Sequence, residues 1–289
     1  MTTTIDSPLV SAAWVNTHLQ AADLRILDCT MVMEPTEDGG FQFVSGEPGW
    51  CDAHIPRSAY ISVPDALSDP DAPFAFTMPN PEVVAAAMQR HGVGAGCAVV
   101  LYDRGNHAWA ARVWWMLRAC GFDNAAVLNG GWAAWTTAGY AVTDEVSVAA
   151  TVDAFAVRPR HSLFVDKRSV MQAIDDPRSL LIHSLSPALF HGEAQAYARA
   201  GRIPGSCNVF CESLLDSDTR CYLPVEQIRA RLQAIEAFSK DRIITYCGGG
   251  IAASSNALAL TAAGLNNVAV YDGSLSEWTA DPDLPMEVG

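Results

Sequence analysis

The residues best suited to covalent chemistry in this chain surround Cys247. The run "ITYCGGGIAASSNALALTAAG", residues 244–264, places one thiol between an apolar stretch and three glycines, ahead of a small-residue helical pattern. A strand that stops, a glycine turn and a helix start direct several backbone N–H groups into one concavity, where the helix dipole favours negative charge. Such a site favours the thiolate form of a cysteine, which is its nucleophilic form. We therefore expect Cys247 to be catalytic, the alternative being a cysteine that only packs in the core.

The residues after Cys247 are expected to bind the negative charge on the cysteine through their backbone N–H groups. The N–H groups that would stabilise it belong to Gly248, Gly249, Gly250, Ile251 and Ala252. Three glycines also suit a close approach of the backbone or unusual dihedral angles.

The chain contains an internal repeat that includes this loop. In the first half, "AHIPRSAYI" (residues 53–61) precedes "CAVVLYDRGNHAWAARVWWMLRACG" and "AAVLNGGWAAW". In the second half, "GRIPGSCNV" (residues 201–209) precedes "DRIITYCGGGIAASSNALALTAAG" and "VAVYDGSLSEW" in the same order. Tyr102 precedes Trp135 by 33 residues, and Tyr246 precedes Trp278 by 32. The two halves are therefore read as copies of one unit.

Each copy alternates short apolar runs with longer helical patterns. The runs "AVVLY", "AAVL", "RIITY" and "VAVY" have the length of strands. In "NPEVVAAAMQRHG", Asn80-Pro81 is a helix start signal and Gly92 a stop signal. The segment "PVEQIRARLQAIEAF" has apolar residues at helical spacing. This alternation predicts an α/β fold of two domains, each a mainly parallel sheet with helices on both faces.

The expected boundary between the copies lies in the polar, weakly periodic stretch of residues 143–162. We place it near Asp153, with one domain over residues 1–150 and the other over residues 155–289.

Alignment of the halves on Tyr102 and Tyr246 sets Asp103 opposite Cys247, 144 residues apart. One copy thus offers a carboxylate where the other offers a thiol. We expect the first copy to be non-catalytic, since it lacks the thiol at this position.

At these residues the chain resembles the tandem-domain rhodaneses, the thiosulfate and 3-mercaptopyruvate sulfurtransferases. The resemblance rests on "HIPRSAY" and "RIPGSCNV", on "YCGGGIAAS" as the active loop, and on the N-terminal copy with Asp103 in the cysteine position. It implies that Cys247 accepts a sulfane sulfur from a small donor, becomes a persulfide, and passes the sulfur to a thiophilic acceptor such as cyanide, a thiol or thioredoxin.

The loop departs from the family pattern in ways that bear on the donor. Thiosulfate-type members carry basic residues directly after the cysteine, whereas Gly248 and Gly249 are uncharged. The loop is closer to the mercaptopyruvate type, so we expect 3-mercaptopyruvate to be preferred over thiosulfate. The family's first donor-binding arginine falls on Leu189. We expect Arg202 to supply a substitute charge, since a guanidinium suits a small carboxylate, with Arg199 as a second candidate.

Other polar residues near the motifs have structural as well as functional readings. His54 matches a histidine that some mercaptopyruvate enzymes use near the active site, but a buried histidine is more often structural. Arg104, His107 and Arg112 follow Asp103 and are interpreted as interface or surface residues.

Two alternatives to a sulfurtransferase follow from the same residues. A cysteine phosphatase of this fold needs an arginine six residues after the cysteine, and that position is Ala253. A persulfide carrier or regulatory rhodanese-like module without turnover stays open, because the donor arginine is missing at Leu189.

The remaining composition limits partners and cofactors. A net charge of −14 disfavours nucleic acid and anionic membrane surfaces. The eight cysteines include no CxxC pair and no zinc spacing, so we expect no metal, and no Walker or GxGxxG motif indicates a nucleotide or flavin. No secretory pattern and no run of roughly 18 apolar residues is present, so we expect a cytoplasmic protein.

Overall fold

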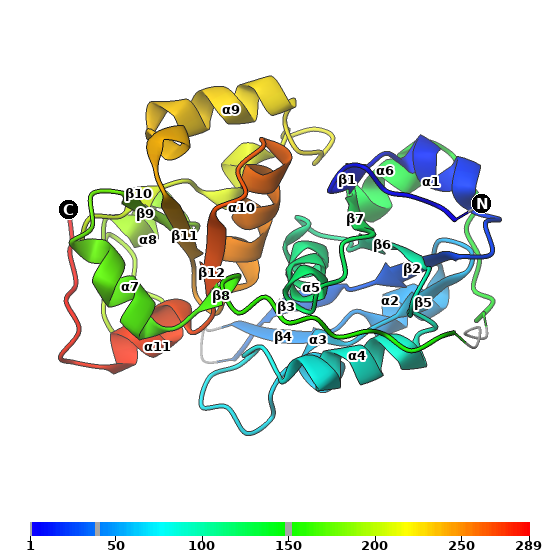
Figure 1. Ribbon diagram of the computed structural model, residues 1–289, viewed down its shortest axis with the longest axis horizontal. Helices are drawn as coiled ribbons and strands as arrows, with labels where there is room; N and C mark the ends of the chain where they lie inside the picture. Colours follow the sequence, from blue (N-terminus) through cyan, green and yellow to red (C-terminus); the bar gives the residue numbers. More distant parts are fainter. Residues whose placement is uncertain (1, 38–40, 148–151) are drawn as a thin grey trace. The chain divides into compact units, whose positions relative to one another are not determined.

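The computed structural model describes residues 2–37, 41–147 and 152–289, and the chain forms two units (Figure 1). The N-terminal unit comprises Met1–Ser68, Pro79–Pro159 and Ser217–Cys221. The C-terminal unit comprises Asp69–Met78, Arg160–Asp216 and Tyr222–Gly289. Residue 150, the expected end of the first domain, lies outside the described residues.

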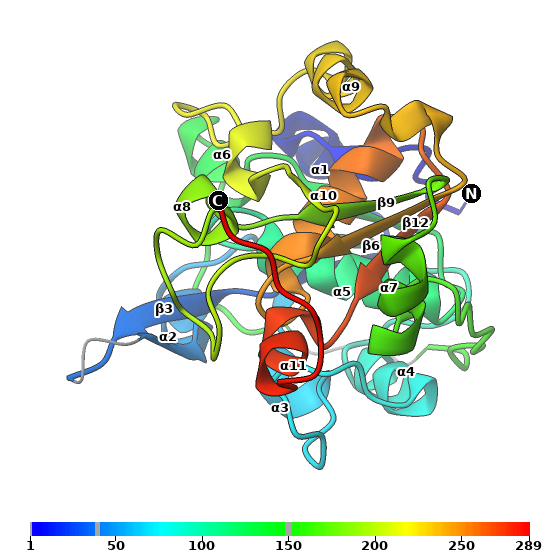
Figure 2. The ribbon, with the colours of Figure 1, turned by 90° about the vertical axis from the view of Figure 1, so that its left-hand side faces the viewer.

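The N-terminal unit is built on a five-stranded sheet in the order β1-β7-β6-β2-β5, with every pair parallel. Its strands are β1 (Leu9–Val10), β2 (Leu24–Asp28), β5 (Ser58–Tyr60), β6 (Ala98–Tyr102) and β7 (Ala125–Leu128). An antiparallel hairpin of β3 (Met31–Pro35) and β4 (Phe41–Ser45) stands apart from this sheet, as β3 shows in Figure 2.

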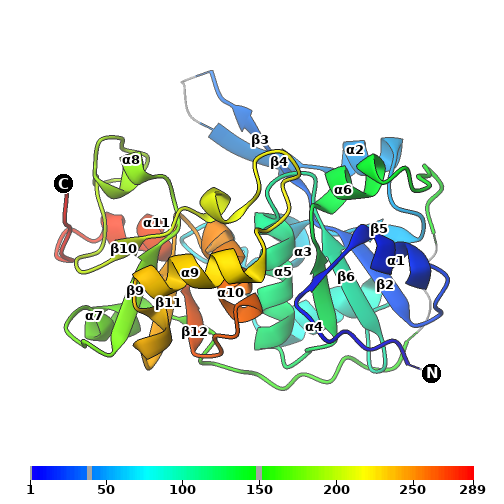
Figure 3. The same ribbon diagram turned by 90° about the horizontal axis from the view of Figure 1, so that it is seen from above.

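The helices of this unit are α1 (Ala12–His18), α2 (Glu47–Asp52), α3 (Val63–Ala66), α4 (Pro81–Arg90), α5 (Ala108–Ala119) and α6 (Gly131–Thr137). The Asn80 side chain accepts from the Glu82 N–H at 3.4 Å and caps α4, which confirms the predicted start signal. Helix α5 packs along β6 and β7 (Figure 3).

The C-terminal unit repeats this plan. Its parallel sheet has the order β10-β9-β11-β12-β8. The strands are β8 (Phe164–Val165), β9 (Ser179–His183), β10 (Cys207–Asn208), β11 (Arg242–Tyr246) and β12 (Val268–Tyr271). The four runs predicted as strands are β6, β7, β11 and β12, so the predicted α/β fold with parallel sheets is confirmed.

Helices cover both faces of the second sheet, with α7 and α11 on one side and α9 and α10 on the other (Figure 1). They are α7 (Lys167–Ile174), α8 (Pro187–Phe190), α9 (Val225–Ala234), α10 (Ile251–Ala262) and α11 (Ser274–Ala280), with 3₁₀ turns at Cys211–Leu214 and Ala237–Ser239. Of the helices in the described part of the chain, none is both long and apolar enough to cross a membrane.

The last residue of each central strand is a tyrosine with an equivalent role in the two units. Tyr102 and Tyr246 are buried, and their hydroxyls contact Ser58 Oγ at 3.2 Å and Ser206 Oγ at 2.8 Å. These serines belong to the repeated "IPRSAY" and "IPGSCN" segments. The hydrogen bonds therefore connect the two motifs of each copy and hold the central strand where the functional loop begins.

Each unit also includes a short segment from the other half of the sequence. Asp69–Met78 belongs to the C-terminal unit, where the Met78 N–H donates to Asp272 Oδ2 at 2.7 Å. Ser217–Cys221 belongs to the N-terminal unit, where the Arg220 carbonyl lies 2.7 Å from His107 Nε2. Periodicity within one half of the sequence could not indicate this exchange.

Candidate active site

Cys247 lies at the carboxyl end of β11, the middle strand of its sheet, and is 2% exposed. Its N–H donates to the Ser274 hydroxyl at 3.1 Å, and its carbonyl accepts from the Leu275 N–H at 3.0 Å. The Gly248 carbonyl accepts from the Ser276 N–H at 2.9 Å. The first turn of α11 thus fixes the thiol at the edge of a parallel sheet where such folds bind ligands.

Ser274 is a site residue that the sequence reading did not select. It has φ of +49°, and its hydroxyl donates to the Tyr271 carbonyl at 2.7 Å while accepting from Cys247. Counting back from Trp135 and Trp278, its counterpart is Gly131, which has φ of +51°. The sequence signal was a serine at the position where the other copy has a glycine. The positive φ shared by the two positions is one that glycine adopts more easily than serine.

Asp103 shows what the backbone of this loop can bind. Its carboxylate is buried, with Oδ1 accepting from the N–H groups of Gly105 at 2.9 Å and His107 at 3.1 Å. Its Oδ2 accepts from the Ala110 N–H at 3.1 Å. The loop between β6 and α5 therefore surrounds one negative group with three backbone donors.

The equivalent loop in the C-terminal unit is one residue shorter. Helix α5 begins five residues after Asp103 and α10 begins four residues after Cys247. The residues before the helices, His107 and Gly250, both have positive φ, 65° and 78°. This locates the one-residue difference between the repeats before the helix, so His107 corresponds to Gly250 and Ala110 to Ala253.

The Asp103 pattern therefore predicts which N–H groups of the cysteine loop would act as donors. The N–H groups of Gly250 and Ala253 correspond to two of the three that bind Asp103, and Gly248 or Gly249 corresponds to the third. Ile251 and Ala252 are the first two residues of α10. Ala253 lies one residue beyond the expected set of Gly248 to Ala252, which stays a prediction.

A persulfide on Cys247 would carry its charged atom at the same number of bonds from the backbone as Asp103 does. The charged oxygens of Asp103 lie two bonds beyond Cβ, and the terminal sulfur of a cysteine persulfide also lies two bonds beyond Cβ. Asp103 thus occupies its loop in the way that a sulfur-loaded cysteine would occupy the other.

A buried polar group lies on the strand beside the cysteine. His183 ends β9, pairs in register with Tyr246, and has its ring 5.2 Å from the Tyr246 ring. Burial, with a smaller contribution from the charge of Arg202, lowers the pKa of His183 to about 4. Within the described chain, His183 Nε2 is buried without a hydrogen-bond partner. His183 is therefore neutral at physiological pH, and it packs against Tyr246, the residue before Cys247.

Burial keeps several other cysteines in the thiol form. It raises the pKa of Cys207 to about 11 and that of Cys120 to about 12. Burial, followed by the charge of Cys247, raises the pKa of Cys211 to about 12. None of these three is suited to act as a nucleophile at neutral pH.

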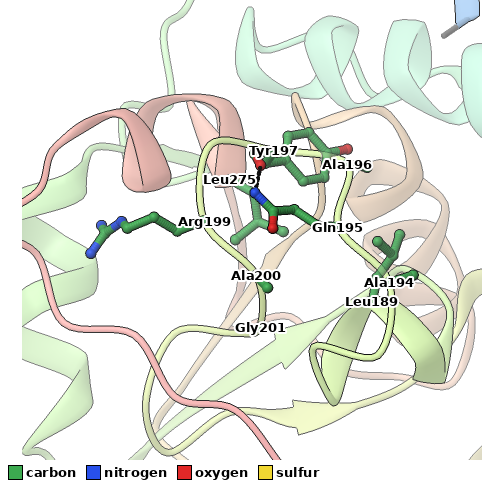
Figure 4. Close-up of a pocket in the computed structure, with 9 residues that line it drawn as sticks. All are labelled: Leu189, Ala194, Gln195, Ala196, Tyr197, Arg199, Ala200, Gly201 and Leu275. Atoms are coloured by element: carbon green, nitrogen blue, oxygen red, sulfur yellow. Dashed lines mark hydrogen bonds between the residues drawn. The ribbon is translucent and has the colours of Figure 1, made fainter.

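The arginines considered as donor-binding groups have structural partners. Arg202 is 8% exposed and donates to Glu287 Oε1 at 2.8 Å, to the Gly289 carbonyl at 2.7 Å and to the Phe190 carbonyl at 3.2 Å. Arg199 donates to carbonyls at the end of α11, namely those of Trp278, Thr279, Asp281 and Leu284. Figure 4 shows the Arg199 side chain extending away from the ring of Tyr197. A donor-binding role for Arg202 stays a prediction, and its present contacts favour anchoring residues 287–289.

His54 and Arg104 also have partners within the N-terminal unit. His54 is buried, stacks on Trp50 with ring centroids 4.3 Å apart, and has its Nδ1 2.8 Å from the Trp50 carbonyl. Arg104 pairs with Asp28 at 3.5 Å and lies 4.2 Å over the Trp132 ring. These contacts are those of structural residues.

Tyr197 is the second site residue that the sequence reading missed. A Cβ built on Gly248 would lie 1.8 Å from its hydroxyl oxygen, so this oxygen contacts the residue after the nucleophile. Figure 4 shows Tyr197 among Leu189, Gln195 and Leu275, around a hollow too tight for a water molecule. The sequence offered no signal, because Tyr197 is 50 residues from Cys247 in an irregular segment.

No cluster of three or more His, Cys, Asp or Glu side chains with the geometry of a metal site occurs among the described residues.

Two α/β units with parallel sheets, one holding a thiol and one a carboxylate in equivalent backbone loops, define a duplicated protein with a cysteine at this position in one copy only. The chain belongs to the rhodanese family. The model of the rhodanese-like domain matches it twice, over residues 11–138 and 170–281.

Named relatives cover nearly the whole chain. A protein of Pseudomonas aeruginosa named "Probable 3-mercaptopyruvate sulfurtransferase" is 33% identical over 97% of this chain and 98% of its own length. The 3-mercaptopyruvate sulfurtransferase of Escherichia coli K12 is 30% identical over 96% of this chain and 97% of its own. Thiosulfate sulfurtransferase of Gallus gallus is 29% identical over 93% and 92%.

Among solved structures, the anaerobic ergothioneine biosynthesis enzyme of Chlorobium limicola superposes with a TM-score of 0.82. The match covers 98% of this chain and 70% of that one at 24% identity, and it shows a shared fold.

Proposed function

We propose that this chain is a sulfurtransferase that moves a sulfane sulfur from 3-mercaptopyruvate or thiosulfate to a thiophilic acceptor through a persulfide on Cys247. The class of reaction is that of its named relatives. Acceptors of suitable chemistry are cyanide, a small thiol or a thioredoxin-like protein, and the cytoplasm is the proposed location.

The first half-reaction uses only the thiolate and the backbone. With 3-mercaptopyruvate, the Cys247 thiolate attacks the donor sulfur, the S–S bond forms and the C–S bond breaks. The electron pair of that bond goes to the carbon, which takes the former thiol proton, so the products are pyruvate and the persulfide anion. With thiosulfate, the S–S bond of the donor breaks and sulfite leaves with the electron pair. Both steps conserve atoms and charge.

The observation that carries this proposal is the Asp103 carboxylate. Three backbone N–H groups hold it at 2.9 to 3.1 Å, and the equivalent loop surrounds Cys247. The same donors facing a persulfide would stabilise its negative charge without a basic side chain. The adjoining residues Gly248 and Gly249 add no charge, which favours the singly charged 3-mercaptopyruvate over the thiosulfate dianion.

Sulfur loading of Cys247 gives the direct test. Incubation with 3-mercaptopyruvate should add the mass of one sulfur atom to the intact protein, and the addition should be absent in Cys247→Ser. Cys207→Ser is the matched control, since its thiol has a raised pKa and should be irrelevant to loading. A gain that persists in Cys247→Ser would show that another residue carries the sulfur.

The carrier without turnover is the second candidate, favoured by Leu189 at the expected arginine position and by the engaged guanidinium of Arg202. It predicts that Cys247 accepts sulfur from a partner persulfide but not from small donors. Continuous release of pyruvate from 3-mercaptopyruvate in the presence of excess thiol would exclude it.

A further inference from the structure

The residue after the nucleophile differs sharply between the two units. In the N-terminal unit, Arg104 follows Asp103, and its guanidinium reaches Asp28 and the Trp132 ring. In the C-terminal unit, Gly248 follows Cys247. The position that holds a cation beside the carboxylate therefore has no side chain beside the thiol.

Tyr197 occupies the direction in which a side chain at position 248 would project. A Cβ on Gly248 would lie 1.8 Å from the Tyr197 hydroxyl oxygen, 2.7 Å from Cζ and 3.0 Å from Cε1. Real Cβ atoms do not approach other atoms this closely, so the Tyr197 side chain can keep this position only with glycine at residue 248. The consequence is that a phenol replaces a basic side chain as the polar group next to Cys247.

The Tyr197 hydroxyl is suited to donate a hydrogen bond. Burial, followed by the charge of Cys247, raises the pKa of Tyr197, so the hydroxyl keeps its proton at neutral pH. Within the part of the chain that the structure describes, this hydroxyl has no hydrogen-bond partner, whereas those of Tyr246 and Tyr271 donate at 2.8 Å to Ser206 and Glu277. The residue is half-buried and its hydroxyl is not among the buried polar atoms that lack a partner, so the hydroxyl is open to an acceptor that arrives from solvent.

We propose that Tyr197 is a specificity-determining residue whose hydroxyl donates a hydrogen bond to the ketone oxygen of the incoming 2-oxo acid donor. The inference rests on the proposed sulfur transfer. When the C–S bond of 3-mercaptopyruvate breaks, its electron pair spreads onto the ketone oxygen before the carbon takes the proton. A neutral O–H donor stabilises this developing charge, but it offers a dianion such as thiosulfate no charge compensation.

Tyr197→Phe tests the proposal, because it removes the hydroxyl and keeps the ring that packs in the segment. We expect kcat with 3-mercaptopyruvate to fall roughly 10- to 100-fold, with KM changing much less, since the hydrogen bond strengthens as charge develops. The ratio of kcat/KM for 3-mercaptopyruvate to that for thiosulfate should fall at least about tenfold. Tyr140→Phe, in the N-terminal unit, is the matched control and should leave both values unchanged.

The outcomes separate this inference from the proposed function. A Tyr197→Phe variant with an unchanged donor ratio would overturn the role of Tyr197 while leaving sulfur transfer intact. A wild-type protein that loads no sulfur on Cys247 from either donor would instead overturn the proposed function. Equal losses with both donors would also reject Tyr197 as a specificity residue, since a purely structural defect affects the two alike.

Discussion

Cys247 and Asp103 occupy equivalent loops. They differ because a sulfur bound to Cys247 could be passed to another molecule, whereas the Asp103 carboxylate cannot be transferred. The carboxylate of Asp103 is bound permanently by the N–H groups of Gly105, His107 and Ala110. A sulfur on Cys247 would be held by the corresponding donors and still be transferable, because an S–S bond can be attacked by a second thiolate. The Asp103 loop therefore shows how the Cys247 loop would bind a negative charge.

Replacing Cys247 by Asp should place a permanent negative charge in the Cys247 loop. We expect Cys247→Asp to carry no sulfur. Its free energy of unfolding should be about 1–3 kcal/mol higher than that of Cys247→Ala, because the carboxylate accepts hydrogen bonds from the N–H groups and alanine accepts none. Urea denaturation of the two variants measures the difference. Equal or lower stability of the aspartate variant would mean that the shorter loop does not direct its donors at this position.

At the scale of elements, the three glycines between β11 and α10 are not equivalent, and two of them have a physical reason to be glycine. Gly248 leaves room for the Tyr197 hydroxyl. Gly250 has φ of +78° and starts α10, a conformation that costs other residues free energy. Gly249 has neither constraint, since a Cβ there would meet only the Ala75 carbonyl oxygen at 3.6 Å and Phe76 at 4.0 Å.

The difference between Gly249 and Gly250 is directly testable. We expect Gly250→Ala to lower the free energy of unfolding by about 1–2 kcal/mol, because alanine is strained at positive φ. Gly249→Ala, its neighbouring control, should change stability by less than about 0.5 kcal/mol. Thermal unfolding of both variants provides the comparison, and similar losses would contradict the assignment of separate roles.

At the scale of the whole molecule, stability at acid pH should depend on a buried histidine. Burial lowers the pKa of His183 in the folded chain to about 4, from the ordinary histidine value of 6.5. Between these two values the unfolded chain binds a proton that the folded chain does not. The free energy of unfolding therefore falls as pH decreases through this window, by up to about 3 kcal/mol, and this contribution is fully present above it.

His183→Gln should remove that dependence. The loss of stability between about pH 7 and about pH 4.5 should be smaller in the variant than in the wild type, as measured by urea denaturation at each pH. Asn16→Gln, at an exposed position on helix α1 with no titrating group, is the control and should retain the wild-type slope. Identical slopes for wild type and His183→Gln would show that His183 accepts a proton in the folded state.

Much of this protein could be predicted from its sequence, because the chain carries its own internal comparison. The repeated Tyr, Trp and "IPxS" positions identified the two copies and showed that Asp103 and Cys247 are equivalent positions. The short apolar runs identified the four core strands. These features depend on short-range patterns, since periodicity, turn residues and spacing along the chain are local properties. A spacing of 33 against 32 residues even contained the one-residue difference between the loops, without indicating where it lies.

Tertiary structure alone decided which groups meet at the thiol. Tyr197, Ser274 and the segment Asp69–Met78 reach the Cys247 loop from positions 27 to about 178 residues away, so no local pattern could associate them with it. The partners of Arg202 were likewise undetermined, because whether a guanidinium faces a substrate or a carbonyl depends on how the last residues fold back. Sequence therefore determined the candidate nucleophile and its backbone setting, and long-range packing decided which side chains lie around it.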